Sequence, residues 1–178
     1  MIEVTVASLG LDRTTNTPVV ILREKGGTRV LPIWIGPAEA SAIAMEMQGM
    51  KAARPLTHDL MKTIIVGLGG DLRRVVISQV KENTYYAELL IRREDHVFQV
   101  DARPSDSIAL ALRLSAPIFT SDTLLDQSGV ELEEPTDPTD PDAPTDPAGP
   151  RPETSLDADK LKQYLEKMDP QDFGKFTP

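Results

Sequence analysis

Residues 97–114 of this chain read Val-Phe-Gln-Val-Asp-Ala-Arg-Pro-Ser-Asp-Ser-Ile-Ala-Leu-Ala-Leu-Arg-Leu. The stretch begins as a strand and ends as a helix, because Pro104 prevents either regular structure from running through the turn between them. We expect Ser105 to cap the helix and Asp106 to lie in its first turn, where the helix dipole favours an anion. The helix, expected over 106–114, is apolar nearly all round and should therefore be buried. A buried helix thus begins at a turn that carries four polar side chains: Asp101, Arg103, Ser105 and Asp106.

The rest of residues 1–128 shows short strands followed by helices. Patterns rich in Val, Ile and Thr predict strands over 2–9, 18–23, 28–35, 72–80, 84–93 and 96–102. Helices are expected over 36–48 and over 57–66, the second with Thr57 as its cap. Moving the first half forward by 67 positions places Pro37 on Pro104 and Glu39 on Asp106. We interpret this match as a diverged internal duplication, which predicts an α+β fold of two βββαα units sharing a mainly antiparallel mixed sheet.

The composition indicates a soluble chain of the cytoplasm that does not enter a membrane. The 178 residues include no cysteine, which excludes disulfides and thiolate sites and suits a reducing compartment. No apolar run approaches the ~18 residues that a membrane span requires. The net charge of -9 is unevenly divided, since residues 1–128 carry 14 Lys or Arg against 15 Asp or Glu, and residues 129–178 carry 5 against 13. A nearly neutral domain neither indicates nor excludes a nucleic-acid binder, because a local basic patch is enough to attract one.

Two further segments follow the domain of residues 1–128. Residues 129–154 form an acidic, proline-spaced tract, which we expect to be a disordered and fairly extended linker. Within residues 155–178, Ser155 can cap a short helix with one apolar face made by Leu156, Leu161, Tyr164, Leu165 and Met168. A helix of about fourteen residues is marginal alone in water. We therefore expect it to dock on its own domain, on a neighbouring subunit or on a partner protein.

Three motifs resemble the bifunctional nuclease family: residues 101–113 with their Arg-Pro-Ser-Asp turn, residues 31–36, and residues 54–60. This family consists of small α+β proteins of bacteria and plants that are described as acting on both DNA and RNA. The resemblance covers roughly residues 1–128, and residues 169–174 also look like the end of bacterial members. One departure is Ser107, where the family more often has alanine. The resemblance implies a nuclease, a duplicated α+β fold and assembly into homo-oligomers.

The charged turn allows two interpretations, and both stay open. Asp101 and Arg103 are two apart in an extended segment and therefore point to the same side. An arginine, two carboxylates and a free helix N-terminus can bind a phosphate, with Mg²⁺ or Mn²⁺ held by Asp101 and Asp106. In this first interpretation, the catalytic residues are Asp101, Arg103 and Asp106, and the substrate is bound by Arg103 and Ser105. In the structural interpretation, Arg103 only pairs with a neighbouring carboxylate and locks the turn.

Other candidate residues lie elsewhere in the chain. His58 is suited to acid–base catalysis near neutral pH, but it equally fits an exposed first turn of a helix. Arg73 and Arg74 can bind a polynucleotide backbone, or they can form the solvated edge of a sheet. Trp34 and Phe98 are expected to pack in the core rather than to stack on bases.

The sequence thus predicts a nuclease that hydrolyses phosphodiester bonds in DNA and RNA with little sequence specificity, and the class of reaction depends on the resemblance. An alternative is a non-catalytic, oligomeric binding or regulatory module that recruits a partner through its C-terminal helix. A third is a small-ligand sensor that holds an anion at the Arg103 turn.

Overall fold

The computed structural model describes residues 1–12, 15–82, 84–128 and 130–131. The strands in this part are Ile2–Leu11 (β1), Pro18–Glu24 (β2), Arg29–Trp34 (β3), Asp71–Lys81 (β4), Thr84–Arg93 (β5), His96–Ala102 (β6), Ile118–Thr120 (β7) and Val130–Glu131 (β8). The helices are Pro37–Met47 (α1), Thr57–Gly67 (α2), Pro104–Leu114 (α3) and Asp122–Ser128 (α4). Every strand and helix expected from the sequence up to residue 114 is present, with ends within a few residues. The linker and the C-terminal helix expected over 129–154 and 155–178 lie outside the described residues, apart from β8.

All described strands belong to one mixed sheet in the order β6-β5-β4-β7-β1-β2-β3-β8. Neighbouring strands are antiparallel except β4 and β7, which are parallel, so the prediction of a mainly antiparallel mixed sheet is confirmed. The three-residue β7 connects the two halves, because it pairs with β4 on one side and with β1 on the other. Both halves begin with three strands and a helix, but β7 then separates α3 from α4. A common origin of the halves stays a prediction.

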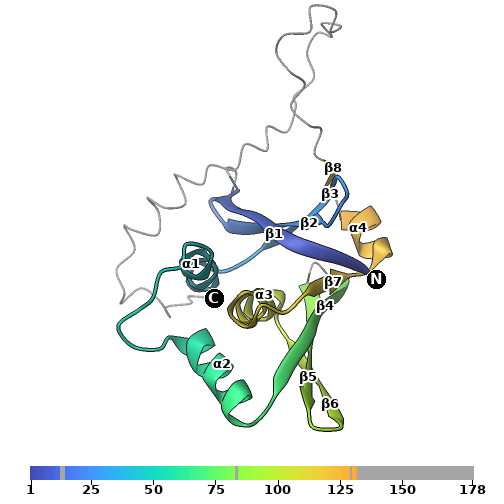
Figure 1. Ribbon diagram of the computed structural model, residues 1–178. Helices are drawn as coiled ribbons and strands as arrows, with labels where there is room; N and C mark the ends of the chain where they lie inside the picture. Colours follow the sequence, from blue (N-terminus) through green and yellow to red (C-terminus); the bar gives the residue numbers. More distant parts are fainter. Residues whose placement is uncertain (13–14, 83, 129, 132–178) are drawn as a thin grey trace, which may run out of the picture.

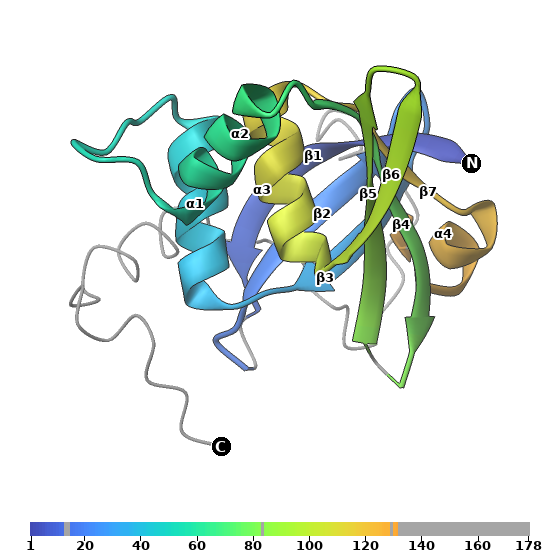
Figure 2. The same ribbon diagram turned by 90° about the horizontal axis from the view of Figure 1, so that it is seen from below.

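The core is built around α3, which lies between the two groups of strands and against α1 and α2 (Figures 1 and 2). Ile108, Ala109 and Leu110 of this helix are completely buried, as its nearly uniform apolar composition predicts. The helix ends at Ser115, whose backbone adopts the left-handed conformation with φ 53°. Because α3 is fixed along its whole length, the charged turn at its first residues is held by a rigid element.

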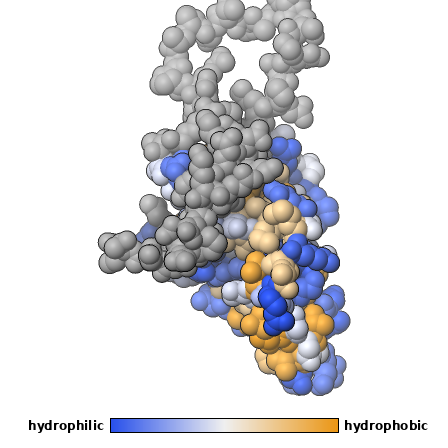
Figure 3. Space-filling model, turned by 90° about the vertical axis from the view of Figure 1, so that its left-hand side faces the viewer, coloured by the Kyte–Doolittle hydropathy of each residue, from blue (hydrophilic) through white to orange (hydrophobic). Residues whose placement is uncertain are grey.

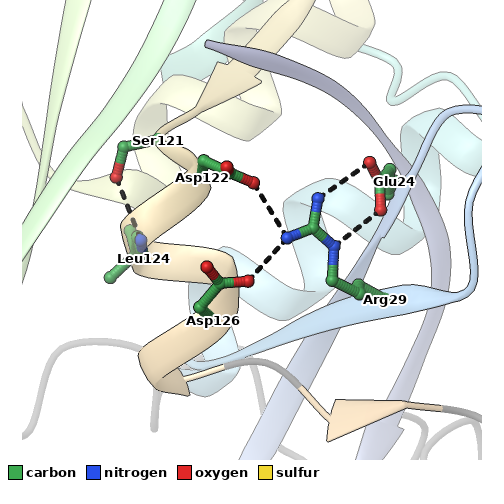
Figure 4. A network of polar contacts seen from close by, with 6 residues as sticks. All are labelled: Glu24, Arg29, Ser121, Asp122, Leu124 and Asp126. Atoms are coloured by element: carbon green, nitrogen blue, oxygen red, sulfur yellow. Dashed lines mark hydrogen bonds and ion pairs between the residues drawn. The ribbon is translucent and has the colours of Figure 1, made fainter.

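An ion-pair network on the surface joins α4 to the β2–β3 hairpin (Figure 4). Arg29 at the start of β3 donates from Nε and Nη2 to the Glu24 carboxylate, at 2.8 and 3.0 Å. Its Nη1 donates to Asp122 at 2.9 Å and to Asp126 at 2.6 Å. One guanidinium therefore neutralises carboxylates from both elements, and these contacts raise the pKa of Arg29.

The expectation that Trp34 and Phe98 pack in the core is wrong. Trp34 is 49% exposed and Phe98 is 50% exposed. Trp34 is the last residue of β3, and its indole N–H donates a hydrogen bond to Asp12 at 2.9 Å. Phe98 lies on β6, which is an edge strand whose residues are exposed on both faces. No helix in the described part of the chain is long and apolar enough to cross a membrane.

Candidate functional site

The turn from β6 into α3 places Arg103, and not Ser105, at the start of the helix. Arg103 is the N-cap, with extended backbone angles, and Pro104 is the first helical residue. Proline suits this position because its missing N–H would have no partner inside the helix and its φ is already helical. The expected Ser105 cap is therefore wrong: Ser105 is the second residue of the helix and only 7% exposed. Asp106 lies in the first turn, as predicted.

Asp106 is the centre of a hydrogen-bonded group at this turn. Its Oδ1 lies 3.0 Å from His58 Nε2 on α2, and its Oδ2 accepts a hydrogen bond of 2.7 Å from Arg103 Nε. Arg103 Nη2 adds a longer contact to Oδ1 at 3.2 Å. The hydrogen bond from His58, followed by the bond and charge of Arg103, lowers the pKa of Asp106 to about 2 although burial opposes the shift. Asp106 is thus a carboxylate at neutral pH.

The protonation of His58 at its Nε2 atom follows from this charge. An ionised carboxylate can only accept hydrogen bonds, so the proton between the two groups belongs to His58 Nε2. His58 is only 7% exposed. The structure therefore excludes the interpretation in which His58 lies on an exposed first turn of a helix. The ring is held by Asp106, and Nδ1 is the nitrogen left for other chemistry.

Arg103 also joins the two halves of the chain. Its Nη2 lies 2.8 Å from Glu39 Oε1, and Glu39 is in the first turn of α1. Gly36 precedes that helix, and a β-carbon at this position would collide with the Glu39 carboxylate. The Arg103 side chain nevertheless remains 64% exposed, so its guanidinium is accessible. We call His58, Asp106, Arg103 and Glu39 the α3 cluster.

Sequence reasoning missed the contact between Glu39 and Arg103, although a signal was present. Glu39 and Asp106 occupy equivalent positions when the first half is moved onto the second, each in the first turn of its helix. The equivalence predicts two similar helix N-termini, but it does not say that they meet. In the structure they share one arginine, because α1 packs directly on α3.

The other predicted site residues lie outside the α3 cluster. Asp101 is exposed on β6, opposite Glu88 of β5, and among the described residues it forms no ion pair with Arg103. Arg73 and Arg74 are exposed on β4, and Arg73 Nη1 donates to Asp71 at 2.9 Å. Asp71 therefore neutralises part of this basic surface. In the described part of the chain, no three His, Asp or Glu side chains are grouped so that they could hold a metal ion.

A buried arginine that the sequence analysis did not single out links the three helices that carry the α3 cluster. Arg113 Nε donates to Asp59 Oδ1 at 2.7 Å, and its Nη1 and Nη2 donate to the carbonyl oxygens of Ala109 and Ala42, at 3.0 and 3.2 Å. Its side chain is only 3% exposed. This one residue connects α1, α2 and α3. The sequence signal for this role was a single basic residue within an otherwise apolar stretch of the helix.

The partner of Arg113 also begins α2. Asp59 Oδ2 accepts the backbone N–H of Leu56 at 2.9 Å, so Leu56 is the N-cap and the expected cap at Thr57 is wrong. The hydrogen bond from Arg113, and then the bond from Leu56, lowers the pKa of Asp59. Since His58 precedes Asp59, the Arg113–Asp59 pair holds the turn that presents His58 to Asp106.

The chemistry open to the α3 cluster follows from its charges. Two carboxylates and one guanidinium give a formal charge of -1 when His58 is neutral. The exposed Arg103 at a helix N-terminus can contact a phosphate oxygen, because the first N–H groups of a helix also favour an anion. The two carboxylates oppose a polyanion unless a further positive charge, from His58 or from a divalent cation, joins them.

Comparison with known proteins gives a family match. The model of the bifunctional nuclease domain matches residues 20–133. An uncharacterized protein of Mycobacterium tuberculosis is 40% identical over 171 residues, which cover 96% of this chain and 97% of that protein. Bifunctional nuclease 2 of Oryza sativa subsp. japonica is 30% identical over 122 residues, or 66% of this chain and 38% of the rice protein. Bifunctional nuclease 1 of Arabidopsis thaliana is 26% identical over 121 residues, or 66% of this chain and 37% of the plant protein.

Proposed function

Because the chain belongs to the bifunctional nuclease domain family, we propose that it is a nuclease that hydrolyses phosphodiester bonds in DNA and RNA with little sequence specificity. The names of the rice and Arabidopsis relatives support this activity, although this chain spans less than two fifths of their length. One observation connects the proposed activity with particular residues. A buried histidine, an ionised aspartate and an exposed arginine are in contact at one helix N-terminus.

Three members of the α3 cluster, namely Arg103, Asp106 and His58, have a role in this proposal. Arg103 binds a non-bridging phosphate oxygen, since its guanidinium is exposed and its planar donors fit a phosphate. Asp106 orients both Arg103 and His58. His58 is the acid or base, and because its Nε2 proton is bound by Asp106, proton exchange falls to Nδ1. Ser105, the other residue of this turn predicted to bind substrate, is only 7% exposed in the first turn of α3.

A divalent cation, Mg²⁺ or Mn²⁺, completes the proposal. The cluster has a negative formal charge, so a phosphodiester needs an added cation to approach it closely. In this proposal the ionised Asp106 would hold the ion together with Asp101; the structure places Asp101 outside the α3 cluster, so the two carboxylates do not form a ready-made metal site. Such an ion would supply positive charge for the phosphate and would lower the pKa of a water bound to it. Arg73 and Arg74 then contact the polynucleotide backbone away from the reacting phosphate.

The test compares Arg103→Ala with Arg23→Ala on end-labelled single-stranded DNA and RNA, with Mn²⁺, with Mg²⁺ and with EDTA. Arg23 is an exposed arginine of β2, which lies outside the α3 cluster and makes a matched control. We expect Arg103→Ala to lose about a hundredfold or more in cleavage rate, the usual effect of removing one transition-state donor, while the melting temperature stays within a few degrees. Equal cleavage by both variants would exclude Arg103 from the reaction.

The same experiment separates the proposal from a non-catalytic, oligomeric binding or regulatory module. The exposed apolar side chains of α2 favour that second function, since Leu60 and Ile64 are each at least half exposed. Salt-sensitive binding without product bands, in every metal condition, would support it. Homo-oligomer formation, which both functions allow, is measured by sedimentation equilibrium.

A further inference from the structure

The outer side of α2 carries a row of exposed apolar residues. Leu60 and Ile64 lie one turn apart and are 53% and 50% exposed, and Leu56 and Leu68 extend the row beyond the two ends of the helix. Residues four apart lie along the same side of a helix. We call Leu56, Leu60, Ile64 and Leu68 the α2 stripe. Figure 3 shows the side of the molecule where α1 and α2 lie, and apolar surface gathers over its lower half.

The α2 stripe is not explained by packing within the described fold. Met61 and Ile65, each one residue after a stripe residue and therefore about 100° round the helix from it, pack against the core. Single exposed leucines are common on protein surfaces, but a contiguous row of large apolar side chains marks a contact with another segment or molecule. The helix therefore has one face in the core and a second apolar face that needs an occupant.

The chain itself contains a segment of matching pattern. Residues 155–168 place Leu161, Tyr164, Leu165 and Met168 at the spacing i, i+3, i+4 and i+7, which is typical of one face of an amphipathic helix. We infer that this C-terminal segment docks as a helix along the α2 stripe of its own chain. The inference does not depend on nuclease activity.

The linker is long enough for this contact. Glu131 is the last described residue, and 24 residues separate it from Leu156. With prolines spaced along it, such a linker reaches about 75 Å at ~3.1 Å per residue. A domain of this size has a radius of gyration of about 14 Å, so every part of its surface is within reach. A tether of this kind also keeps the local concentration of the segment high, which favours its own chain over a second copy.

A segment docked on the α2 stripe would contact the helix that carries part of the candidate site. His58 and Asp59 lie in the first turn of α2, and Leu56 and Leu60 of the stripe flank them along the sequence. The stripe faces away from the core, so an occupant would cover α2 without displacing the Arg113–Asp59 pair. The expected effect on α2 is protection of its outer face from solvent.

The natural absence of cysteine permits a direct test in the full chain. The variant Leu60→Cys/Leu165→Cys is oxidised with glutathione, and disulfide formation is followed by non-reducing electrophoresis over a range of protein concentrations. The control pair Val97→Cys/Leu165→Cys uses Val97 of β6, which is 62% exposed and lies on a different element. Circular dichroism checks that both variants keep the wild-type fold.

The proposal predicts an intramolecular disulfide in the Leu60 pair, formed about tenfold faster than in the Val97 pair and at a rate independent of protein concentration. Equal rates for the two pairs would overturn it, and so would the absence of a disulfide. Disulfide-linked dimers whose yield rises with concentration would instead identify the stripe as a contact between copies. As a second measurement, Leu165→Asp should raise hydrogen exchange in α2 while leaving β4 unchanged, and unchanged exchange in α2 would also contradict docking.

Discussion

Replacing Asp106 by asparagine should remove a pH-dependent part of the free energy of unfolding. The folded protein lowers the pKa of Asp106 from the ordinary value of 3.8 to about 2. One pKa unit corresponds to about 1.4 kcal/mol, so the ionised carboxylate contributes about 2 kcal/mol at neutral pH. The Asp106 side chain is 22% exposed, so solvent screens this contribution only in part.

The direction of the pH effect follows from the lowered pKa. The ionised form is favoured by folding, so its contribution is complete above about pH 5 and is lost as the pH falls from about 4 towards 2. The difference in stability between wild type and Asp106→Asn should therefore be about 2 kcal/mol at neutral pH and shrink steadily in acid.

The assay is urea unfolding of both proteins at a series of pH values from about 7 to 3, followed by far-ultraviolet circular dichroism. Asp95→Asn is the control, since Asp95 is exposed in the turn between β5 and β6. A difference that stays constant with pH would refute the assignment of the stabilisation to the ionised carboxylate. A difference at neutral pH no larger than that of the control would refute the stabilisation itself.

Three further perturbations test other parts of the fold. Arg113→Met should lower the free energy of unfolding by about 2 kcal/mol, because it removes the hydrogen bonds of the buried guanidinium to Asp59 and to the carbonyl oxygens of Ala109 and Ala42; urea unfolding measures the loss, and a change within error would contradict this linking role. Arg29→Leu should speed hydrogen exchange in α4 before it affects β1 and β2, since the Arg29 guanidinium pairs with two carboxylates of that helix; equal exchange in both proteins would argue against this role. Ser115→Gly should raise stability by about 1 kcal/mol by relieving the left-handed backbone, which scanning calorimetry would detect as a higher melting temperature.

The sequence predicted the elements whose signals are local. Pro104 and the glycines after the helices mark ends that a single chain segment determines, and the boundaries of α1, α2 and α3 agree with them closely. The burial of α3 was predictable as well, because a helix that is apolar on all sides has no other stable environment.

What the sequence could not predict depends on contacts between distant segments. The three residues of β7 are too few to show a strand pattern, and their parallel pairing with β4 is decided only in the folded sheet. The exposure of Phe98 reflects the edge position of β6, which alternation along the strand does not reveal. His58 and Asp106 are 48 residues apart, so their hydrogen bond follows from the packing of α2 on α3.

The lateness of β7 in the chain has a consequence during synthesis on the ribosome. The outer edge of β1 is paired by Ile118–Thr120, which are translated more than a hundred residues after it. At translation rates of about 5–20 residues per second, the first strand waits on the order of ten seconds for this neighbour. Throughout that interval the nascent chain presents an unpaired strand edge. A chaperone that shields such edges would therefore act mainly during this interval.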